Sequence, residues 1–240
     1  MDYNMSGRIS YYGGIVKDGL VFYLDAAKNE SYPKTGTIWN DISGNQNRGI
    51  LVNGPTFNSN NGGSIVFDGT NDYVIYSASS FTIGTSPVTL SVWTRISTLS
   101  NWFGISLACG IGSPNRFIWC GYVLTAQYGT SNMLGGGGYG QNIGTDIPPD
   151  DKWHNITTIS NGGSTPTVSI YIDGVFKISA NIILDISSNV VKVGAGDDGI
   201  SNSVAYALIG DVSNAVIYNR ALSATEVLQN YNAIKGRYGL

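Results

Sequence analysis

ALIGDVSNAVIYNRALSATEVL, residues 207 to 228, indicates the architecture of this chain more firmly than any other segment. Apolar and polar side chains alternate in its first half, with the period of two that is typical of a β-strand. A capping box follows, in which the Ser223 hydroxyl accepts the N–H of Glu226 and the glutamate accepts the N–H of the serine. The stretch therefore predicts a strand that leads into a short helix. The packed face of that helix is expected to carry Val227, Leu228, Tyr231 and Ile234.

Short segments with strand character recur along the rest of the chain. We expect strands at residues 20–24, 64–67, 72–76, 88–96, 102–109, 117–124, 153–160, 167–172, 175–178, 190–193 and 204–209. Turn residues predict three hairpins, at 68–71, at 110–115 and at Asp173-Gly174, where a type I′ turn needs two positive φ angles. Many short strands and one terminal helix indicate an all-β fold, a two-sheet antiparallel jelly-roll sandwich with a short C-terminal helix.

Residues 129–144 contain four consecutive glycines and show no clear period. We expect a flexible loop there, longer than most connections and therefore a candidate functional surface. Aromatic side chains around it could stack on sugar rings, anchor a protein interface or fill the core. These candidate ligand-binding residues are Trp102, Trp119, Tyr122, Tyr128 and Tyr139.

The composition argues against several classes of protein. The 240 residues suit one large sandwich, and 42% of them are hydrophobic, which is enough for a core. No apolar run approaches the ~18 residues that span a bilayer, so we expect no membrane insertion. A net charge of -3 without a basic cluster argues against nucleic-acid binding. The N-terminus has no basic region followed by an apolar stretch, so we expect no secretory signal.

Two cysteines, Cys109 and Cys120, flank the turn at 110–115. If the turn closes a hairpin, Cys109 pairs with a residue near Phe117 and not with Cys120. A disulfide requires Cα atoms within ~7 Å of each other. We therefore expect two free thiols and assembly in a reducing compartment.

The first 17 residues hold aromatic and apolar side chains among Gly and Ser, without a clear period. We interpret them as an arm that docks on a partner subunit, with a disordered tail as the alternative. The residues expected to dock are Tyr3, Ile9, Tyr11, Tyr12 and Ile15. Residues 18–240 then form one domain.

A family likeness is carried by residues 41–49 (DISGNQNRG), 64–74, 151–154 (DKWH), 171–175 (YIDGV) and 210–223. In this order and spacing they resemble the laminin G-like branch of the concanavalin A-like jelly rolls. The resemblance implies two curved sheets and the binding of sugars or other proteins. Residues 14–26 (GIVKDGLVFYLDA) are in addition similar to structural proteins of tailed bacteriophages.

The resemblance also implies a structural calcium ion, held by an aspartate near the start of the last strand and by oxygens of an early loop. Asp211 takes the first place here, and Asp41 and Asn45 lie in the corresponding loop. Carboxylate, amide and carbonyl oxygens are the ligands that calcium prefers. The alternative is a turn aspartate that accepts hydrogen bonds from nearby N–H groups. We expect no other cofactor.

Related glucanases place their catalytic carboxylates in a Glu-x-Asp-x-Glu pattern on one strand, and this chain lacks the pattern. Its only glutamates are Glu30, in a polar loop, and Glu226, in the capping box. Retaining glycosidases need two carboxylates about 5 Å apart. His154 is the single histidine, and we expect it to be packed or hydrogen-bonded. The chain is therefore expected not to be an enzyme.

These observations favour a non-enzymatic virion protein of a bacteriophage, either a head decoration or a fibre component. It would assemble in the host cytoplasm with other virion proteins, namely capsid or fibre subunits, and its loops would be free to bind host glycans. We expect a homo-oligomer such as a trimer. The alternative is a carbohydrate-binding, lectin-like module, free or part of a larger adhesin. A glucanase is the third hypothesis.

Overall fold

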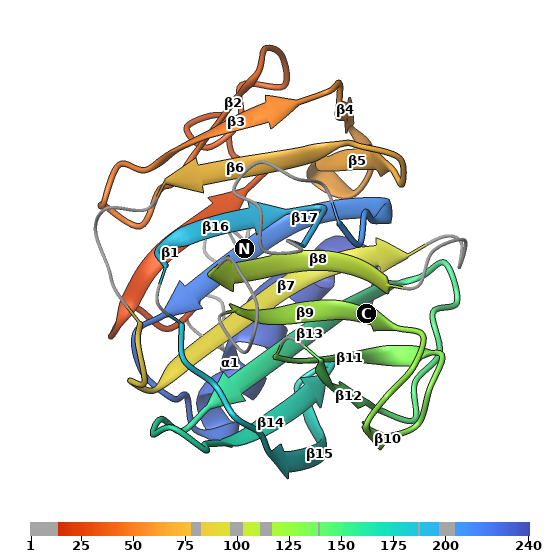
Figure 1. The fold of residues 1–240 in the computed structure, drawn as a ribbon. Helices are drawn as coiled ribbons and strands as arrows, with labels where there is room; N and C mark the ends of the chain where they lie inside the picture. Colours follow the sequence, from red (N-terminus) through yellow and green to blue (C-terminus); the bar gives the residue numbers. More distant parts are fainter. Residues whose placement is uncertain are drawn as a thin grey trace, which may run out of the picture.

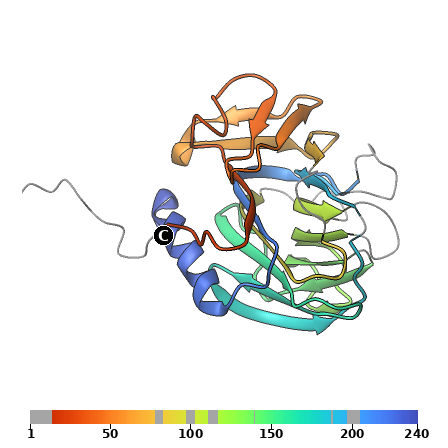
Figure 2. The ribbon, with the colours of Figure 1, turned by 90° about the vertical axis from the view of Figure 1, so that its left-hand side faces the viewer.

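Two β-sheets packed face to face make up the fold (Figure 1 and Figure 2). The computed structural model describes residues 14–77, 83–96, 103–110, 117–138, 140–186, 188–196 and 205–240. Helix α1 (Ala224–Ile234) and the short 3-10 helix η2 (Lys235–Tyr238) follow the last strand. The predicted architecture, an antiparallel jelly-roll sandwich with a short C-terminal helix, is confirmed.

The two sheets are called sheet A and sheet B. The order in sheet A is β15 (Val175–Asn181), β14 (Thr167–Ile172), β13 (Trp153–Ser160), β7 (Val88–Ile96), β17 (Ile209–Tyr218), β5 (Ser64–Asp68) and β4 (Thr56–Asn58), with β1 (Leu20–Asp25) also paired to β17. The order in sheet B is β10 (Tyr128–Gly129), β12 (Gln141–Gly144), β11 (Met133–Gly138), β9 (Phe117–Val123), β8 (Phe103–Gly110), β16 (Val190–Val193), β6 (Tyr73–Ser77), β3 (Arg48–Val52) and β2 (Ile38–Asn40). A 3-10 turn, η1 (Asn60–Gly62), joins β4 to β5.

Alternating side chains along the strands build the core between the sheets. On β9, Cys120 belongs to this core, whereas Trp119 beside it belongs to a separate apolar cluster. Cys109 pairs in register with Ile118, and Cys120 pairs with Leu107. Both thiols are free, as predicted, and burial raises the pKa of each to about 12. Neither thiol is therefore a ready nucleophile near neutral pH.

Helix α1 lies outside the sandwich, against sheet A (Figure 2). Its capping box between Ser223 and Glu226 is present as predicted. Val227 and Ile234 are buried in an apolar cluster with side chains of sheet A. Leu228 is 45% exposed, so its predicted place on the packed face is wrong, because the helix contacts the sheet along a narrower stripe. No helix in the described ranges is long and apolar enough to cross a bilayer.

Two of the three predicted hairpins are confirmed. Strands β8 and β9 pair antiparallel, as the hairpin predicted at 110–115 requires, and Asp173 and Gly174 have the two positive φ angles, 54° and 79°, of a type I′ turn. The turn at 68–71 instead connects β5 of sheet A to β6 of sheet B, so no hairpin forms there. Turn residues predict that the chain reverses, but not which sheet the next strand joins.

The four glycines at 135–138 lie in strand β11, so the predicted flexible loop is wrong. A Cβ atom on Gly135 would come within 2.0 Å of the Ile143 carbonyl oxygen, and one on Gly136 within 2.3 Å of Thr158 Oγ1. Glycine is needed here for close approach between strands and between sheets, which removes the side-chain period that reveals a strand. The last strand begins at Ile209, so the strand predicted at 204–209 is also wrong over residues 205–208.

Residues 14–17, which the sequence placed in the arm, pack against helix α1. The backbone N–H of Val16 donates to Asn230 Oδ1 (2.8 Å), and the Tyr218 hydroxyl donates to the Val16 carbonyl (3.1 Å). Ile15 is only 7% exposed, which corrects its prediction as a docking residue, because it completes the apolar cluster under the helix. The other predicted docking residues, Tyr3, Ile9, Tyr11 and Tyr12, lie outside the described residues.

Candidate ligand-binding cleft

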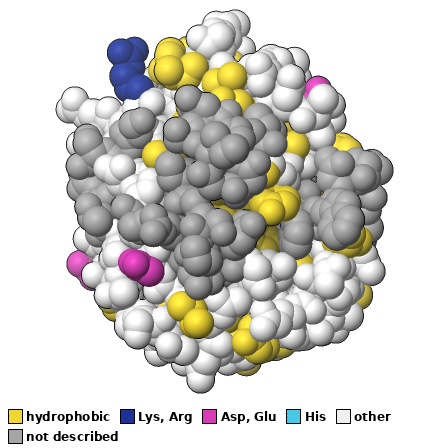
Figure 3. Space-filling model, viewed as in Figure 1, with side chains coloured by type: hydrophobic (Ala, Val, Ile, Leu, Met, Phe, Trp, Pro, Cys, Tyr) yellow, Lys and Arg dark blue, Asp and Glu magenta, His cyan; other side chains and the backbone are white. Residues whose placement is uncertain are grey.

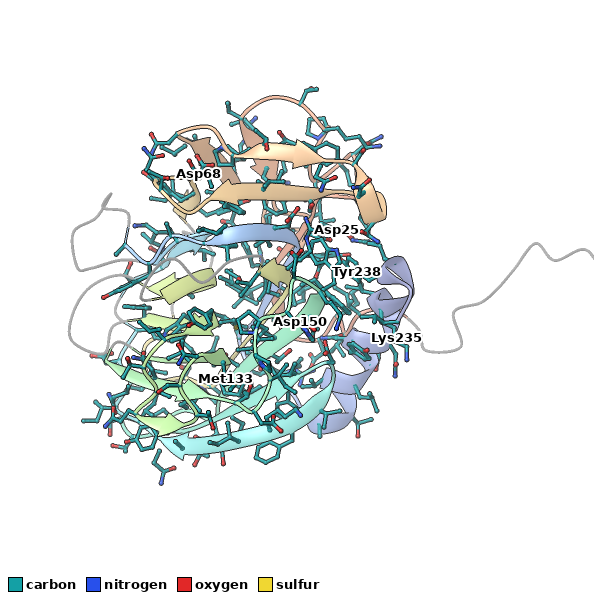
Figure 4. All side chains as sticks on the ribbon, turned by 90° about the vertical axis from the view of Figure 1, so that its right-hand side faces the viewer. Asp25, Asp68, Met133, Asp150, Lys235 and Tyr238 are labelled. Atoms are coloured by element: carbon teal, nitrogen blue, oxygen red, sulfur yellow. The ribbon has the colours of Figure 1, made fainter. Side chains whose placement is uncertain are left out.

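A cleft of about 400 Å³ opens on the outer face of sheet A, beside the end of the chain. We call it the C-terminal cleft. Strands β7 and β13 supply Arg95 and Trp153, α1 supplies Tyr231, and η2 supplies Tyr238. Figure 4 shows Tyr238 and Lys235 at this helical end of the chain.

Four aromatic rings form a continuous stack at the cleft. The Tyr238 ring lies 4.5 Å from the Trp93 ring and 4.7 Å from the Trp153 ring, with interplanar angles of 27° in both pairs. The Tyr231 ring stacks on Trp93 at 5.5 Å and 11°. The register of β7 and β13 places the two tryptophans side by side. Trp153 lies opposite Arg95, so Trp93, two residues along β7, is its diagonal neighbour on the same face.

Trp93 is the base of this stack. It is 1% exposed, and its Nε1 atom is buried without a hydrogen-bond partner. Trp153 is only half-buried and lines the cleft. The stack is thus anchored at the buried Trp93, and the indole ring of Trp153 is available to a ligand in the cleft.

His154 sits between two carboxylates at the rim of the cleft. Its Nδ1 atom lies 2.7 Å from Asp173 Oδ2, and its Nε2 atom lies 3.2 Å from Asp150 Oδ1. Asp173 is held in the type I′ turn, where its other oxygen accepts the Asn155 N–H at 2.8 Å. Carboxylates only accept hydrogen bonds, so this arrangement is best satisfied by a doubly protonated, charged imidazole. The prediction that His154 is hydrogen-bonded is confirmed.

The carboxylates shift the pKa of His154. Burial alone would lower this pKa, but the hydrogen bonds and charges of Asp173 and Asp150 outweigh burial and raise it. For Asp150, burial would raise the pKa, but Lys152 and His154 lower it. The cluster therefore favours the charged form of each group.

The free energy of unfolding is expected to fall as the pH rises through neutrality. The unfolded pKa of histidine is about 6.5, and the folded pKa of His154 lies above that value. Stability gained from a raised pKa is fully present below the unfolded pKa and is lost as the pH passes the folded one. Urea unfolding across this window measures it, with His154→Gln as the control that lacks the titration. Equal slopes for the two proteins would contradict the prediction.

Arg95 and Asp211 form an ion pair at the inner end of the cleft. Asp211 is 2% exposed, and its Oδ2 atom accepts hydrogen bonds from Arg95 Nε (3.2 Å) and Nη2 (2.9 Å). The Ser64 hydroxyl donates to the other oxygen at 2.9 Å. Asp151 stands 3.8 Å from Arg95 Nε and is far more exposed. The guanidinium is therefore bracketed by two carboxylates.

The family model described as the concanavalin A-like lectin/glucanases superfamily matches residues 68–228, more than half of the chain. The chain belongs to this superfamily. A search of curated proteins finds no similar sequence. The family thus rests on the family model, and the predicted likeness to concanavalin A-like domains is confirmed.

Solved structures share the fold of this superfamily member at low identity. Domain 4 of AbnA, a GH43 extracellular arabinanase from Geobacillus stearothermophilus solved with arabinotriose, is 16% identical, with a TM-score of 0.63 over 88% of this chain and 98% of that one. A Trypanosoma rangeli sialidase gives 16% and 0.66 over 91% and 33%. The binding domain of botulinum neurotoxin serotype D/C gives 17% and 0.64 over 91% and 53%. This chain thus spans about a third of the sialidase and half of the neurotoxin domain.

The calcium ligands predicted for this superfamily member do not come together. Asp41 accepts hydrogen bonds from the Tyr23 N–H (2.9 Å) and from Asn47 Nδ2 (2.6 Å), and Asn45 donates to a backbone carbonyl. Tyr23 pairs with Val216, five residues along β17 from Asp211, or roughly 16 Å at the rise of a strand. The described residues contain no group of three or more His, Cys, Asp or Glu that could hold a metal. Calcium binding stays a prediction without a site.

The predicted aromatic ligand residues are also separated. Trp119 (1% exposed) belongs to the cluster on the outer face of sheet B, and Tyr122 (2% exposed) belongs to the main core. Tyr128 packs against that core, while Trp102 and Tyr139 lie outside the described residues. Figure 3 shows that few charged side chains of the described residues appear on the sheet B side.

Sequence reasoning missed the C-terminal cleft itself. The segments 151–154 and 171–175 were recognised only as marks of the fold, although they supply Trp153, His154 and Asp173. An aromatic-histidine pair beside an acidic residue was the available signal. The sequence does not indicate that the chain's last residues return across sheet A, and those residues complete the cleft.

Proposed function

We propose that this domain is a non-enzymatic carbohydrate-binding module whose sugar site is the C-terminal cleft. The observation that carries the proposal is the stack of Trp93, Tyr238 and Trp153 beside Arg95 and His154. A sugar ring presents an apolar face that suits an indole ring, and its hydroxyl groups need donors and acceptors around the edge. Pockets with aromatic walls and a few polar groups are typical of small-ligand sites.

The ligands of the related structures support the same class of ligand. The arabinanase domain was solved with arabinotriose, and structures of botulinum neurotoxin relatives concern gangliosides and a sialyl ligand. One neurotoxin binding domain was instead solved with a protein, synaptotagmin II. Protein binding is therefore the main rival to glycan binding within this fold.

The surroundings of the acidic side chains support the proposal that the domain is not an enzyme. Glu226 is bound by Arg220, whose hydrogen bonds hold the pKa of this carboxyl near 2, and Glu30 is exposed in a loop. Asp211 is paired to Arg95. Within the cleft, Asp150 and Asp173 are hydrogen-bonded to His154 and so are not a free acid and nucleophile. Release of reducing sugar from a bound glycan would disprove this part.

Replacing Trp153 with alanine is expected to weaken glycan binding by about tenfold or more, because the variant loses a half-buried ring of the stack that lines the cleft. Arabinotriose and a neutral glycan array identify a ligand, and calorimetry measures its affinity. Tyr171→Ala is the control, since Tyr171 contacts Phe176 on sheet A rather than lining the cleft. Unchanged binding by Trp153→Ala, or equal loss in the control, would place the site elsewhere.

We also propose that the module is carried on a bacteriophage particle, as a head decoration or fibre component. The support is the similarity of residues 14–26 to phage structural proteins and the exposure of Leu228 near the first described residues. Gly14 accepts a hydrogen bond from Gln229, next to the exposed Leu228. Electron microscopy of the native particle tests the placement and the symmetry of any oligomer together.

A further inference from the structure

The C-terminal cleft is surrounded by charged side chains of both signs. Two permanently charged cations, Arg95 and Lys152, face it, and His154 is a third when protonated. Four carboxylates lie against these cations. They are Asp150, Asp151, Asp173 and Asp211. Asp151 and Asp173 line the cleft itself, whereas Asp150 and Asp211 pair with its cations from outside the lining.

Each cation is also already paired. Lys152 Nζ lies 2.7 Å from Asp150 Oδ2, and Arg95 Nη2 lies 2.9 Å from Asp211 Oδ2. His154 contacts a carboxylate through both ring nitrogens. Sites that bind carboxylate or phosphate ligands offer an unpaired Arg or Lys, often in bidentate geometry. None of the described cations of this cleft is offered in that way.

We infer that the C-terminal cleft selects neutral and amino sugars and rejects glycans that carry acid groups, such as uronic and sialic acids. The inference rests on the proposed function and names its ligand class. A ligand carboxylate would meet Asp151 and Asp173 in the lining and would have to compete for cations that already have partners. An ammonium group would instead find carboxylates and the indole face of Trp153, both of which attract cations.

Asp151 is the residue best placed to set this selectivity. Its side chain is 58% exposed, and its carboxylate stands 3.8 Å from Arg95 Nε at the cleft. Its φ angle of 60° is a left-handed value that asparagine also adopts readily. Asp151→Asn therefore removes one negative charge and leaves the fold intact.

Glycans that differ only in charge test the inference directly. Affinity electrophoresis compares polygalacturonate with its fully methyl-esterified form, and an array compares neutral, amino and acidic oligosaccharides. We expect the form without acid groups in each matched pair to bind more strongly, on the order of tenfold at low salt, and the difference to shrink at high salt. Equal or stronger binding of the acidic forms would overturn the inference while leaving the proposed function standing.

The Asp151→Asn variant completes the test. We expect it to narrow the preference for uncharged glycans several-fold, because one repelling charge is removed. Asp146→Asn is the matched control, since Asp146 pairs with Lys177 and does not line the cleft. An unchanged preference in Asp151→Asn would overturn the role of this residue. Failure of every glycan, charged or not, to bind the wild-type domain would instead defeat the proposed function.

Discussion

Replacing Arg237 with alanine is expected to destabilise the domain by about 3–5 kcal/mol. Arg237 donates to both oxygens of Asp25, from Nη1 at 2.8 Å and from Nη2 at 2.9 Å. Asp25 is 1% exposed, so the variant would leave a buried carboxylate without a counter-charge. The Ala27 N–H and the Tyr23 hydroxyl would remain as donors, but neither carries a charge. Urea unfolding measures the loss.

Two further variants test whether the loss of stability comes from the buried charge of Asp25. Lys235→Ala removes a cation from the same segment, but Lys235 lies over the Tyr231 ring at 5.3 Å and is expected to contribute only about 0.5–1 kcal/mol. Adding Asp25→Asn to Arg237→Ala removes the stranded charge and should recover part of the stability. If Arg237→Ala costs no more than Lys235→Ala, the ion pair does not hold the chain end in place.

The Arg237–Asp25 pair also explains why the cleft could not be predicted from local sequence. It joins residues 212 positions apart and brings η2 back across sheet A, where Tyr238 enters the aromatic stack. The Tyr238 hydroxyl is hydrogen-bonded to the hydroxyl of Ser213 on β17. Neither contact has a periodic or motif signal, because each depends on where distant strands lie.

Much of the fold was predictable because its signals are local. The strand before the helix, the capping box at Ser223 and the positive φ pair at Asp173-Gly174 each depend on a few neighbouring residues, and all three are present, although β17 is buried along both faces rather than alternately. The errors lie where the outcome depends on distant chain. The turn at 68–71 passes from one sheet to the other, and the glycines at 135–138 form a strand through close packing.

For the cleft too, the sequence shows the local segments but not how the strands bring them together. The segment 151–154 was visible in the sequence, but only the register of β13 on β7 places Trp153 opposite Arg95 and beside Trp93. Asp211 was predicted as a calcium ligand from its position near the start of the last strand. The structure instead gives it Arg95 as a partner, and no sequence pattern indicates which charge a buried aspartate will meet.

Replacing Gly210 with alanine is expected to destabilise the domain by about 2–4 kcal/mol. Gly210 lies in β17 between β7 and β5, with a φ angle of 156°. A Cβ atom there would stand 2.1 Å from the backbone carbonyl oxygen of Arg95, which cannot move without disturbing the pairing of the two strands. Thermal and urea unfolding measure the change, and glycan affinity should fall with it because Arg95 borders the cleft.

Gly236→Ala is the matched control for Gly210→Ala. An added Cβ on Gly236 meets no atom within 4 Å, and this glycine is not among those with positive φ. The substitution reduces the entropy of the unfolded chain and should stabilise the domain by about 0.4–1 kcal/mol. The two glycine variants are therefore expected to move stability in opposite directions. If both stabilise the domain, β17 does not approach β7 as closely as the described register requires, and the placement of Arg95 and Asp211 at the cleft fails with it.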